Sequence, residues 1–282
     1  MRTLLLTGAA LACFAGNSLL ARLALRGGEV DGGSFTAVRI VSGALTLALL
    51  LTVRPGGLRA IATTGSARAA FALFAYAILF SLAYLSLSAG TGALILFAAV
   101  QITMLIAGVA RGHRPGGAEW SGLALAFGGL VYLVSPGLSA PPFAGAALMA
   151  AAGAAWGFYT MAAKGAGTPI AATAGNFARA VPMALAAWLA TWAMGGAHIS
   201  WNGAGLAAAS GALTSGLGYA IWYTALETLP LTRAAIVQLT VPLIAAVAGV
   251  LLLGEAMSWR LAVAALAILG GVGLALAGKS RN

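Results

Sequence analysis

The side chains able to bind a small molecule lie inside long apolar runs of the chain. In the run 67–87, Tyr76 and Phe80 are four residues apart, which places both on one face of a helix. Tyr219 occupies a similar place in the run 203–226. Two aromatic faces predict the wall of a cavity for a small organic molecule. The same spacing also suits ordinary helix packing, or rings at the level of the lipid headgroups.

Polar groups within these runs point to the same kind of cavity. Asn17, Gln101 and Gln238 are amides that need hydrogen-bond partners in an apolar surrounding, and Trp156 has an indole N–H to satisfy. We therefore predict that these four residues line the cavity, although amides also serve as glue between helices. Pro242 frees a backbone carbonyl one turn earlier and is predicted to act as a hinge.

Arg39 and Arg179 are the charged residues placed well inside apolar runs. A guanidinium binds a carboxylate in two-point fashion, so each arginine is a candidate carboxylate anchor. The alternatives are that they cap helix carbonyls, hold neighbouring helices together or, for Arg39 above all, extend toward the membrane surface.

The five acidic residues, Glu29, Asp31, Glu119, Glu227 and Glu255, all fall in predicted loops or at the edges of apolar runs, as do both histidines. A proton-driven carrier commonly holds a carboxyl or histidine at depth as its relay. This distribution favours a facilitator over a proton antiporter. It also argues against lipophilic cations as the main cargo, because their counter-ion is missing.

Other classes of function fit the sequence poorly. No His, Cys and carboxylate cluster has metal-ligand spacing, and no base accompanies a nucleophile within a run. We therefore expect no metal, no cofactor and no catalytic residue. The net charge of +10 is scattered singly between apolar runs rather than clustered, so nucleic acid is not an expected partner.

Composition sets the class of protein. Of the 282 residues, 61% are hydrophobic and 7% charged, against about 25% charged in soluble domains. One helical span takes about 20 residues, so ten spans leave short loops and no soluble domain. We predict an all-α integral membrane protein with spans at 3–22, 34–53, 67–87, 91–110, 119–134, 142–163, 171–193, 203–226, 231–252 and 258–277.

Lysine and arginine set the expected orientation. With the N-terminus inside, ten of these residues fall on the cytoplasmic side, whereas Arg22, Arg26 and Arg260 fall outside. Both termini should therefore be cytoplasmic in a multi-pass inner-membrane protein. The first run also resembles a secretory signal peptide, but we expect it to be retained as a span.

The two halves of the chain repeat weakly. A shift of about 141 residues places Gly16 on Gly157 and Gly108 on Gly249. Because each half has an odd number of spans, the second enters the membrane inverted, an arrangement that puts a substrate site near the midplane. We expect five-helix units at 1–137 and 138–282, although Ala/Gly/Leu-rich helices also resemble one another by composition.

The second half resembles the EamA-type drug/metabolite transporters in its motifs Trp156-Gly157-Phe158, Arg179, Pro242, Gly254-Glu255 and Gly270-Gly271. The first half departs from that pattern with Ala15 for the tryptophan, Gln101 for the proline and His113-Arg114 for the Gly-Glu pair. The resemblance implies a ten-helix carrier made of two inverted repeats. Within the superfamily, the chain is most similar to YddG-like amino-acid exporters in length and in the style of its first half.

These observations predict an alternating-access carrier that exports small metabolites, with neutral or zwitterionic amino acids as the main hypothesis. The bilayer and a small-molecule substrate are the expected partners, and a monomer should suffice because an internal repeat completes the pathway. Alternatives are a proton-coupled exporter of other metabolites or drugs, a membrane-embedded lipid-modifying enzyme, or a channel.

Overall fold

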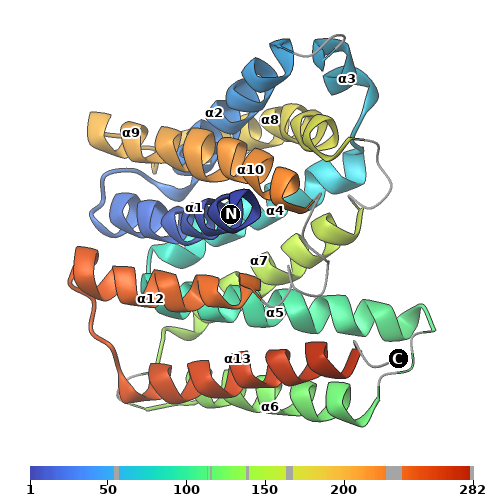
Figure 1. The fold of residues 1–282 in the computed structure, drawn as a ribbon. Coiled ribbons are helices and arrows are strands. Elements are labelled where there is room, and N and C mark those ends of the chain that lie inside the picture. Colours follow the sequence, from blue (N-terminus) through green and yellow to red (C-terminus); the bar gives the residue numbers. More distant parts are fainter. Residues whose placement is uncertain are drawn as a thin grey trace.

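The chain folds into a bundle of helices (Figure 1). The computed structural model describes residues 1–53, 57–112, 114, 116–137, 140–162, 168–226 and 237–279. Its helices are α1 (Arg2–Arg26), α2 (Gly32–Thr52), α3 (Gly57–Thr63), α4 (Ala67–Tyr84), α5 (Ala89–Ala110), α6 (Gly117–Val134), α7 (Phe143–Ala162), α8 (Pro169–Ala193), α9 (Trp201–Ala209), the π-helix η1 (Ser210–Leu217), α10 (Gly218–Leu226), α12 (Thr240–Leu253) and α13 (Trp259–Lys279).

Local signals in the sequence fix several helix ends. Ser66, Ser88 and Ser200 each precede a helix, and their hydroxyl oxygens accept hydrogen bonds from the backbone N–H three residues later at 3.1, 3.3 and 2.9 Å. Such caps satisfy N–H groups that have no partner within the helix. Gly254 ends α12 in the left-handed conformation with φ +62°, which glycine adopts without strain.

The predicted all-helical membrane fold is confirmed. Seven helices are each long and apolar enough to cross a bilayer, namely α1, α2, α4, α5, α6, α7 and α13. The 25-residue α8, the continuous segment from α9 through α10 and the shorter apolar α12 bring the described chain, apart from the seven-residue α3, to ten helical segments, which fit the ten predicted spans. The described residues contain no strand beyond an isolated bridge between Val30 and Ile199.

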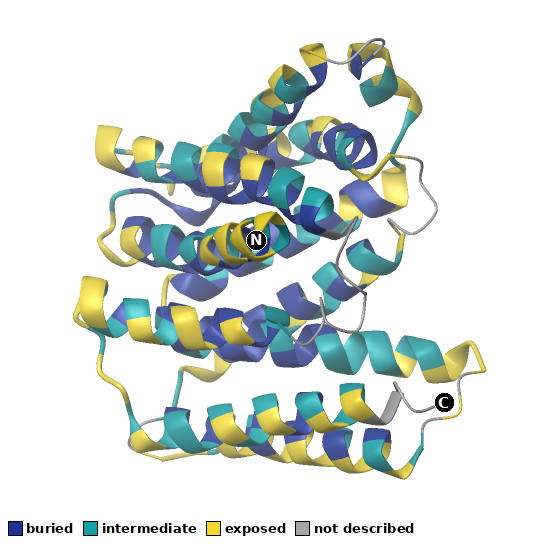
Figure 2. Cartoon of the chain, viewed as in Figure 1, coloured by how far each residue is buried: buried dark blue, intermediate teal, exposed yellow. Residues whose placement is uncertain are grey.

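Helices from the two ends of the chain pack on one another. The pair α6 and α13 lies side by side at one end of the bundle, while α2 packs on α8 and η1 (Figure 1). In the middle, α4 packs on α7, α5 packs on α7 and α12, and α1 packs on α10 and α12. Large apolar side chains such as Trp120, Leu251 and Leu266 are exposed, as expected for lipid contact. Figure 2 shows exposed positions along the outer helices of the bundle.

The π-helix lets the eighth segment approach α2 closely. A Cβ added to Gly211 would lie 2.1 Å from the Arg39 carbonyl oxygen, and one added to Gly216 would lie 3.0 Å from the Thr46 Cβ. Glycine at both positions therefore permits contact between backbones. A π-helix opens the usual hydrogen-bond spacing and is frequent at functional sites. Neither the π-helix nor its glycine contacts were predicted from the sequence.

Two loops at one end of the bundle are joined through Asp31. Its carboxylate caps α2 by accepting from the Ser34 N–H at 2.9 Å, and it also accepts from the His198 N–H at 2.9 Å. Burial alone would raise the pKa of Asp31, but hydrogen bonds from Ser34 and from backbone N–H groups, that of His198 among them, lower it below its ordinary value.

This arrangement makes the stability depend on pH. Since the pKa is lower in the folded than in the unfolded state, Asp31 stabilises the fold above its unfolded pKa of about 3.9. The contribution is lost as the pH falls through the folded-state pKa. We expect Asp31→Ala to cost about 0.5–2 kcal/mol at pH 7. In thermal melts of detergent-purified protein, the difference in melting temperature between Asp31→Ala and wild type should become smaller at acidic pH.

Ser66→Ala is the matched control, because Ser66 caps α4 without titrating. Its destabilisation should be similar in size and constant across the same pH range. A gap for Asp31→Ala that does not change with pH would contradict the role assigned to the carboxylate.

Candidate functional site

A hydrogen-bond network joins three helices of the first half at the Tyr76 hydroxyl. That oxygen accepts from Asn17 Nδ2 of α1 at 3.2 Å and from Arg39 Nη2 of α2 at 3.0 Å. All three residues are buried. The network therefore brings together three of the residues selected from the sequence, although they are 22 to 59 positions apart.

The π-helix supplies the other half of this network. Asn17 Oδ1 accepts from the hydroxyls of Ser210 at 2.7 Å and Thr214 at 3.3 Å, and Arg39 Nε donates to Ser215 Oγ at 3.4 Å. Sequence reasoning missed these three hydroxyl residues. Their signal was visible as a run of Ser and Thr among glycines in the middle of the predicted span 203–226.

Aromatic rings form a continuous wall beside the network. The Trp156 ring of α7 lies 4.8 Å from Tyr76 and 5.4 Å from Tyr219, measured between ring centroids. Tyr76 in turn lies 5.4 Å from Phe80, and Tyr219 lies 6.1 Å from Phe177 of α8. The spacings match favourable aromatic pairing, so the wall is preorganised. The structure thus brings together Asn17, Arg39, Tyr76, Phe80, Trp156 and Tyr219.

Arg39 is the dominant charge at this place. Arg39 is only 2% exposed. Its guanidinium carbon lies 5.1 Å from the centroid of the Tyr76 ring and 4.8 Å from the centroid of the Phe80 ring. Cation–π contacts of this kind stabilise the charge in part. Nη1 is buried and has no hydrogen-bond partner among the described residues. An arginine so placed can donate to an anionic group.

The comparisons place the chain among membrane transporters. The profile of the EamA-like transporter family matches residues 143–277. The uncharacterized protein PA1977 of Pseudomonas aeruginosa is 53% identical over 278 residues, covering 98% of this chain and 95% of that protein. A crystal structure of another protein shares the fold with a TM-score of 0.67 at 17% identity, covering 97% of this chain and 96% of that one.

The second half of the chain therefore resembles the EamA-like transporter family. Members of this family are membrane transporters of small molecules, so the buried cluster is a candidate substrate site within a carrier. The family match lies in the half of the chain that carries the motifs singled out above. Sequence reasoning had placed the chain in the same superfamily.

Arg179 does not reach the cluster. Its guanidinium donates to carbonyl oxygens at the end of α3 and the turn that follows, at 2.8 Å to Ala62 and 2.6 Å to Thr64. It also donates to Gly175 within its own helix at 3.0 Å. Arg179 therefore caps the end of α3, which is one of the alternatives considered from the sequence. Arg39 is then the remaining candidate for a carboxylate anchor.

Gln101, Gln238 and Pro242 also lie outside the network. Both glutamines are half-buried, Gln101 in the second half of α5 and Gln238 just before α12. Pro242 is the third residue of α12, where its missing N–H costs little, and the helix is interrupted at Leu239. The break therefore precedes the proline, and the hinge role of Pro242 stays a prediction.

The Tyr76 hydroxyl holds the network together, so its removal should be costly. Tyr76→Phe leaves Arg39 Nη2 and Asn17 Nδ2 without their acceptor and should lower the free energy of unfolding by about 1–3 kcal/mol. Thermal or denaturant unfolding of the purified protein measures this difference.

Tyr132→Phe serves as the control, because Tyr132 is 41% exposed on α6. That change should be close to neutral. Equal effects of the two substitutions would show that the Tyr76 hydroxyl does not organise the site.

Proposed function

We propose that this transporter exports neutral or zwitterionic amino acids across the inner membrane by alternating access, as a facilitator. The observation that carries the proposal is the buried Arg39, whose guanidinium has a free Nη1 and no carboxylate partner among the described residues. A buried charge is costly unless it is paired. A substrate carboxylate would supply the missing partner and gain a charge-assisted hydrogen bond.

The aromatic wall suits the rest of an amino acid. The rings of Trp156, Tyr76 and Tyr219 contact one another and form one aromatic surface, against which a small apolar side chain of the substrate would pack. The same faces attract an ammonium group through cation–π contact. Adding a zwitterion leaves the net charge of the site unchanged, whereas a lipophilic cation would meet the positive charge of Arg39 without a counter-ion.

The placement of the acids supports facilitation rather than proton coupling. In the described part of the chain, Glu29, Asp31, Glu119 and Glu255 lie in loops or at helix ends. Glu227 lies outside the described residues. None of the described acids stands in the Asn17–Arg39–Tyr76 network, where a proton relay coupled to substrate would be expected.

Alternating access is proposed to use two inverted five-helix units, 1–137 and 138–282. In an inverted repeat of five segments, each segment of the first unit corresponds to the segment five places later. A contact between two segments should therefore have an equivalent contact between the two corresponding segments. The packing of α4 on α7 has such a counterpart in α10 on α1, and α5 on α7 in α12 on α1. The contacts of α2 with α8, of α5 with α12 and of α6 with α13 each join two corresponding segments, so the repeat maps each of these contacts onto itself. This pairing supports the proposed repeat.

Cytoplasmic termini and a functional monomer complete the proposal. Arginines cluster at the helix ends that would then face the cytoplasm, which the positive-inside rule favours. In the described chain these are Arg2, Arg59, Arg68, Arg111 and Arg114, against Arg22, Arg26 and Arg260 at the opposite ends. A reporter fused after Asn282 should be active only in the cytoplasm, and an external reporter would overturn this topology.

The test of function is uptake of labelled amino acids by liposomes that contain the purified protein. We expect saturable uptake of neutral amino acids that does not change when a pH gradient is imposed. Arg39→Gln should reduce that uptake about tenfold or more, since a hydrogen bond to a charged group contributes about 1.5–3 kcal/mol. Trp156→Ala should reduce it as well, because the aromatic wall is broken.

Trp120→Ala is the matched control for Trp156→Ala, because Trp120 is 52% exposed on α6. Uptake by this control should equal that of wild type. Uptake that requires a pH gradient would contradict facilitation, and no uptake of any amino acid would contradict the substrate class.

A further inference from the structure

One carboxylate from the second half of the chain is bound by a side chain and a backbone N–H of the first half. Glu255 lies between α12 and α13, and its Oε1 accepts from Arg22 Nε at 3.1 Å. Its Oε2 accepts from the Ala89 N–H, at the start of α5, at 2.8 Å. The Arg22 and Glu255 side chains are only 11% and 7% exposed. This is the one salt bridge among the described residues.

The same ion pair satisfies two helix ends. Arg22 Nη1 donates to the carbonyl oxygen of Tyr84 at 3.0 Å and to that of Leu85 at 3.5 Å, where α4 ends. Glu255 receives the N–H of Ala89, where α5 begins. A cation at a helix C-terminus and an anion at a helix N-terminus are both favourable. Four elements, α1, α4, α5 and the α12–α13 loop, therefore meet at this pair.

Small residues close the helices around the pair. A Cβ added to Gly90 would lie 2.6 Å from the Ala246 Cβ, so α5 and α12 touch directly at this end. A Cβ added to Gly249 would lie 2.6 Å from Glu255 Oε2. Under the proposed topology this is the outer end of the bundle, and it is tightly closed.

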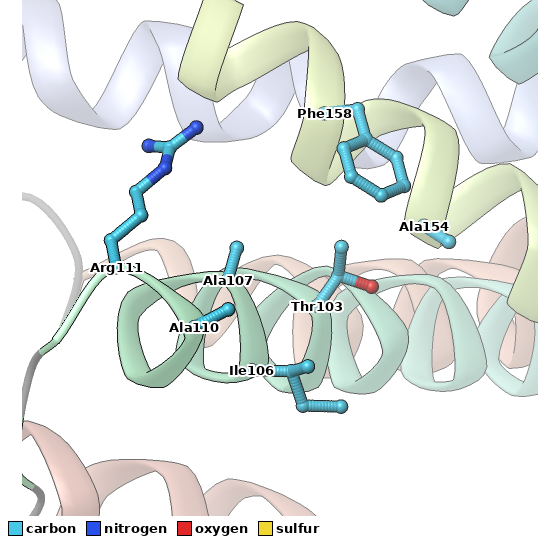
Figure 3. Close-up of a pocket in the computed structure, with 7 residues that line it drawn as sticks. All are labelled: Thr103, Ile106, Ala107, Ala110, Arg111, Ala154 and Phe158. Atoms are coloured by element: carbon cyan, nitrogen blue, oxygen red, sulfur yellow. The ribbon is translucent and has the colours of Figure 1, made fainter.

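The opposite half of α5 is less buried. Residues 89–100 are mostly buried, whereas residues 101–111 are half-buried or exposed, and Figure 2 shows the change along α5. A cavity of about 470 Å³ lies between this part of α5 and α7. In Figure 3 the Phe158 ring projects from α7 beside it and Arg111 stands at the end of α5. In the described part of the chain, the outer end of α5 is therefore closely packed, whereas its inner half borders a cavity.

The two halves of the sequence differ at the positions of the Arg22–Glu255 ion pair. With the shift of about 141 residues, Glu255 corresponds to Arg114, and Arg22 to position 163, next to Lys164. Position 163 and Lys164 lie outside the described residues, and the comparison rests on their sequence. Arg114, Ala163 and Lys164 include no acidic side chain, so the sequence does not repeat the Arg22–Glu255 pair at these equivalent positions.

We propose that Arg22 and Glu255 form the outer gate of the transport cycle. The ion pair holds the outer ends of α1, α4, α5 and α12 together in the inward-open state and must break for the outward-open state. The pair therefore stabilises the inward-open state relative to the outward-open state. The inference rests on the proposed alternating access but not on the identity of the substrate.

The test measures how fast the outside solution reaches a reporter below the gate. Ser18 lies one turn from Arg22 on α1 and is 3% exposed, and Cys13 is the single native cysteine. In a Cys13→Ser, Ser18→Cys background, an impermeant maleimide is added from the outer side of oriented vesicles. We expect Glu255→Gln to raise the labelling rate at least about tenfold, because the ion pair is lost.

Arg22→Gln should have the same effect, but it also uncaps α4 and can impair folding. Glu255→Gln carries the test because it is isosteric and keeps an oxygen for the Ala89 N–H. Arg260→Gln is the matched control. Arg260 also donates to carbonyl oxygens at a helix end, those of Leu133 in α6 and Pro136 just after it, and it has no carboxylate partner among the described residues. Its labelling rate should stay at the parent value.

Unchanged labelling of a folded Glu255→Gln variant would overturn the gate, as would an equal rise in Arg260→Gln. Neither result depends on transport of amino acids. Failure of the gate is therefore distinguishable from failure of the proposed function, which the uptake experiment tests separately.

Discussion

The structure depends on how a positive charge is kept inside a bundle that crosses a membrane. Arg39 is almost fully buried, and no carboxylate pairs with it among the described residues. The rings of Tyr76 and Phe80 and the hydroxyls of Tyr76 and Ser215 make the charge tolerable. They do not neutralise it, because none of them is negatively charged, and Nη1 of Arg39 has no hydrogen-bond partner among the described residues. A buried unpaired cation favours any ligand that brings an anionic group.

Several features of the fold serve this arrangement. The glycines of η1 allow it to lie against α2, and this close approach brings Ser215 to Arg39 and Ser210 to Asn17. Aromatic residues of α4, α7 and α10 then surround the polar network. The site is thus assembled from both halves of the chain, as expected for a carrier whose halves move against each other. The Arg22–Glu255 pair fixes the same two halves at one end.

Much of this could be predicted from the sequence, because lipid makes polar residues within apolar runs conspicuous. Asn17 and Trp156 were selected on that ground, Tyr76 and Tyr219 from the spacing of aromatic residues, and the structure brings all four together. Ser210, Thr214 and Ser215 were missed because short hydroxyl side chains normally bond to their own helix and attract little attention. The π-helix that redirects them has no reliable sequence signal.

The two arginines show why position along a helix was insufficient to predict which of them reaches the candidate site. Arg39 and Arg179 occupy matching places in the two halves, and the sequence made Arg179 the deeper of the two. The difference arises from α3, a short helix whose terminal carbonyls meet Arg179 and take up its donors. Arg39 has no such neighbour, and its guanidinium reaches the Tyr76 hydroxyl instead. Which partner an arginine finds is a property of tertiary packing.

Competition between matched ligands tests the role of Arg39 most directly. Labelled uptake into proteoliposomes would be challenged with a neutral amino acid, its amide and the corresponding amine, which differ at the carboxylate. The account predicts strong competition by the amino acid and weak competition by the other two. Arg39→Gln should abolish that preference. Equal competition by all three compounds in the wild-type protein would contradict a carboxylate bound at Arg39.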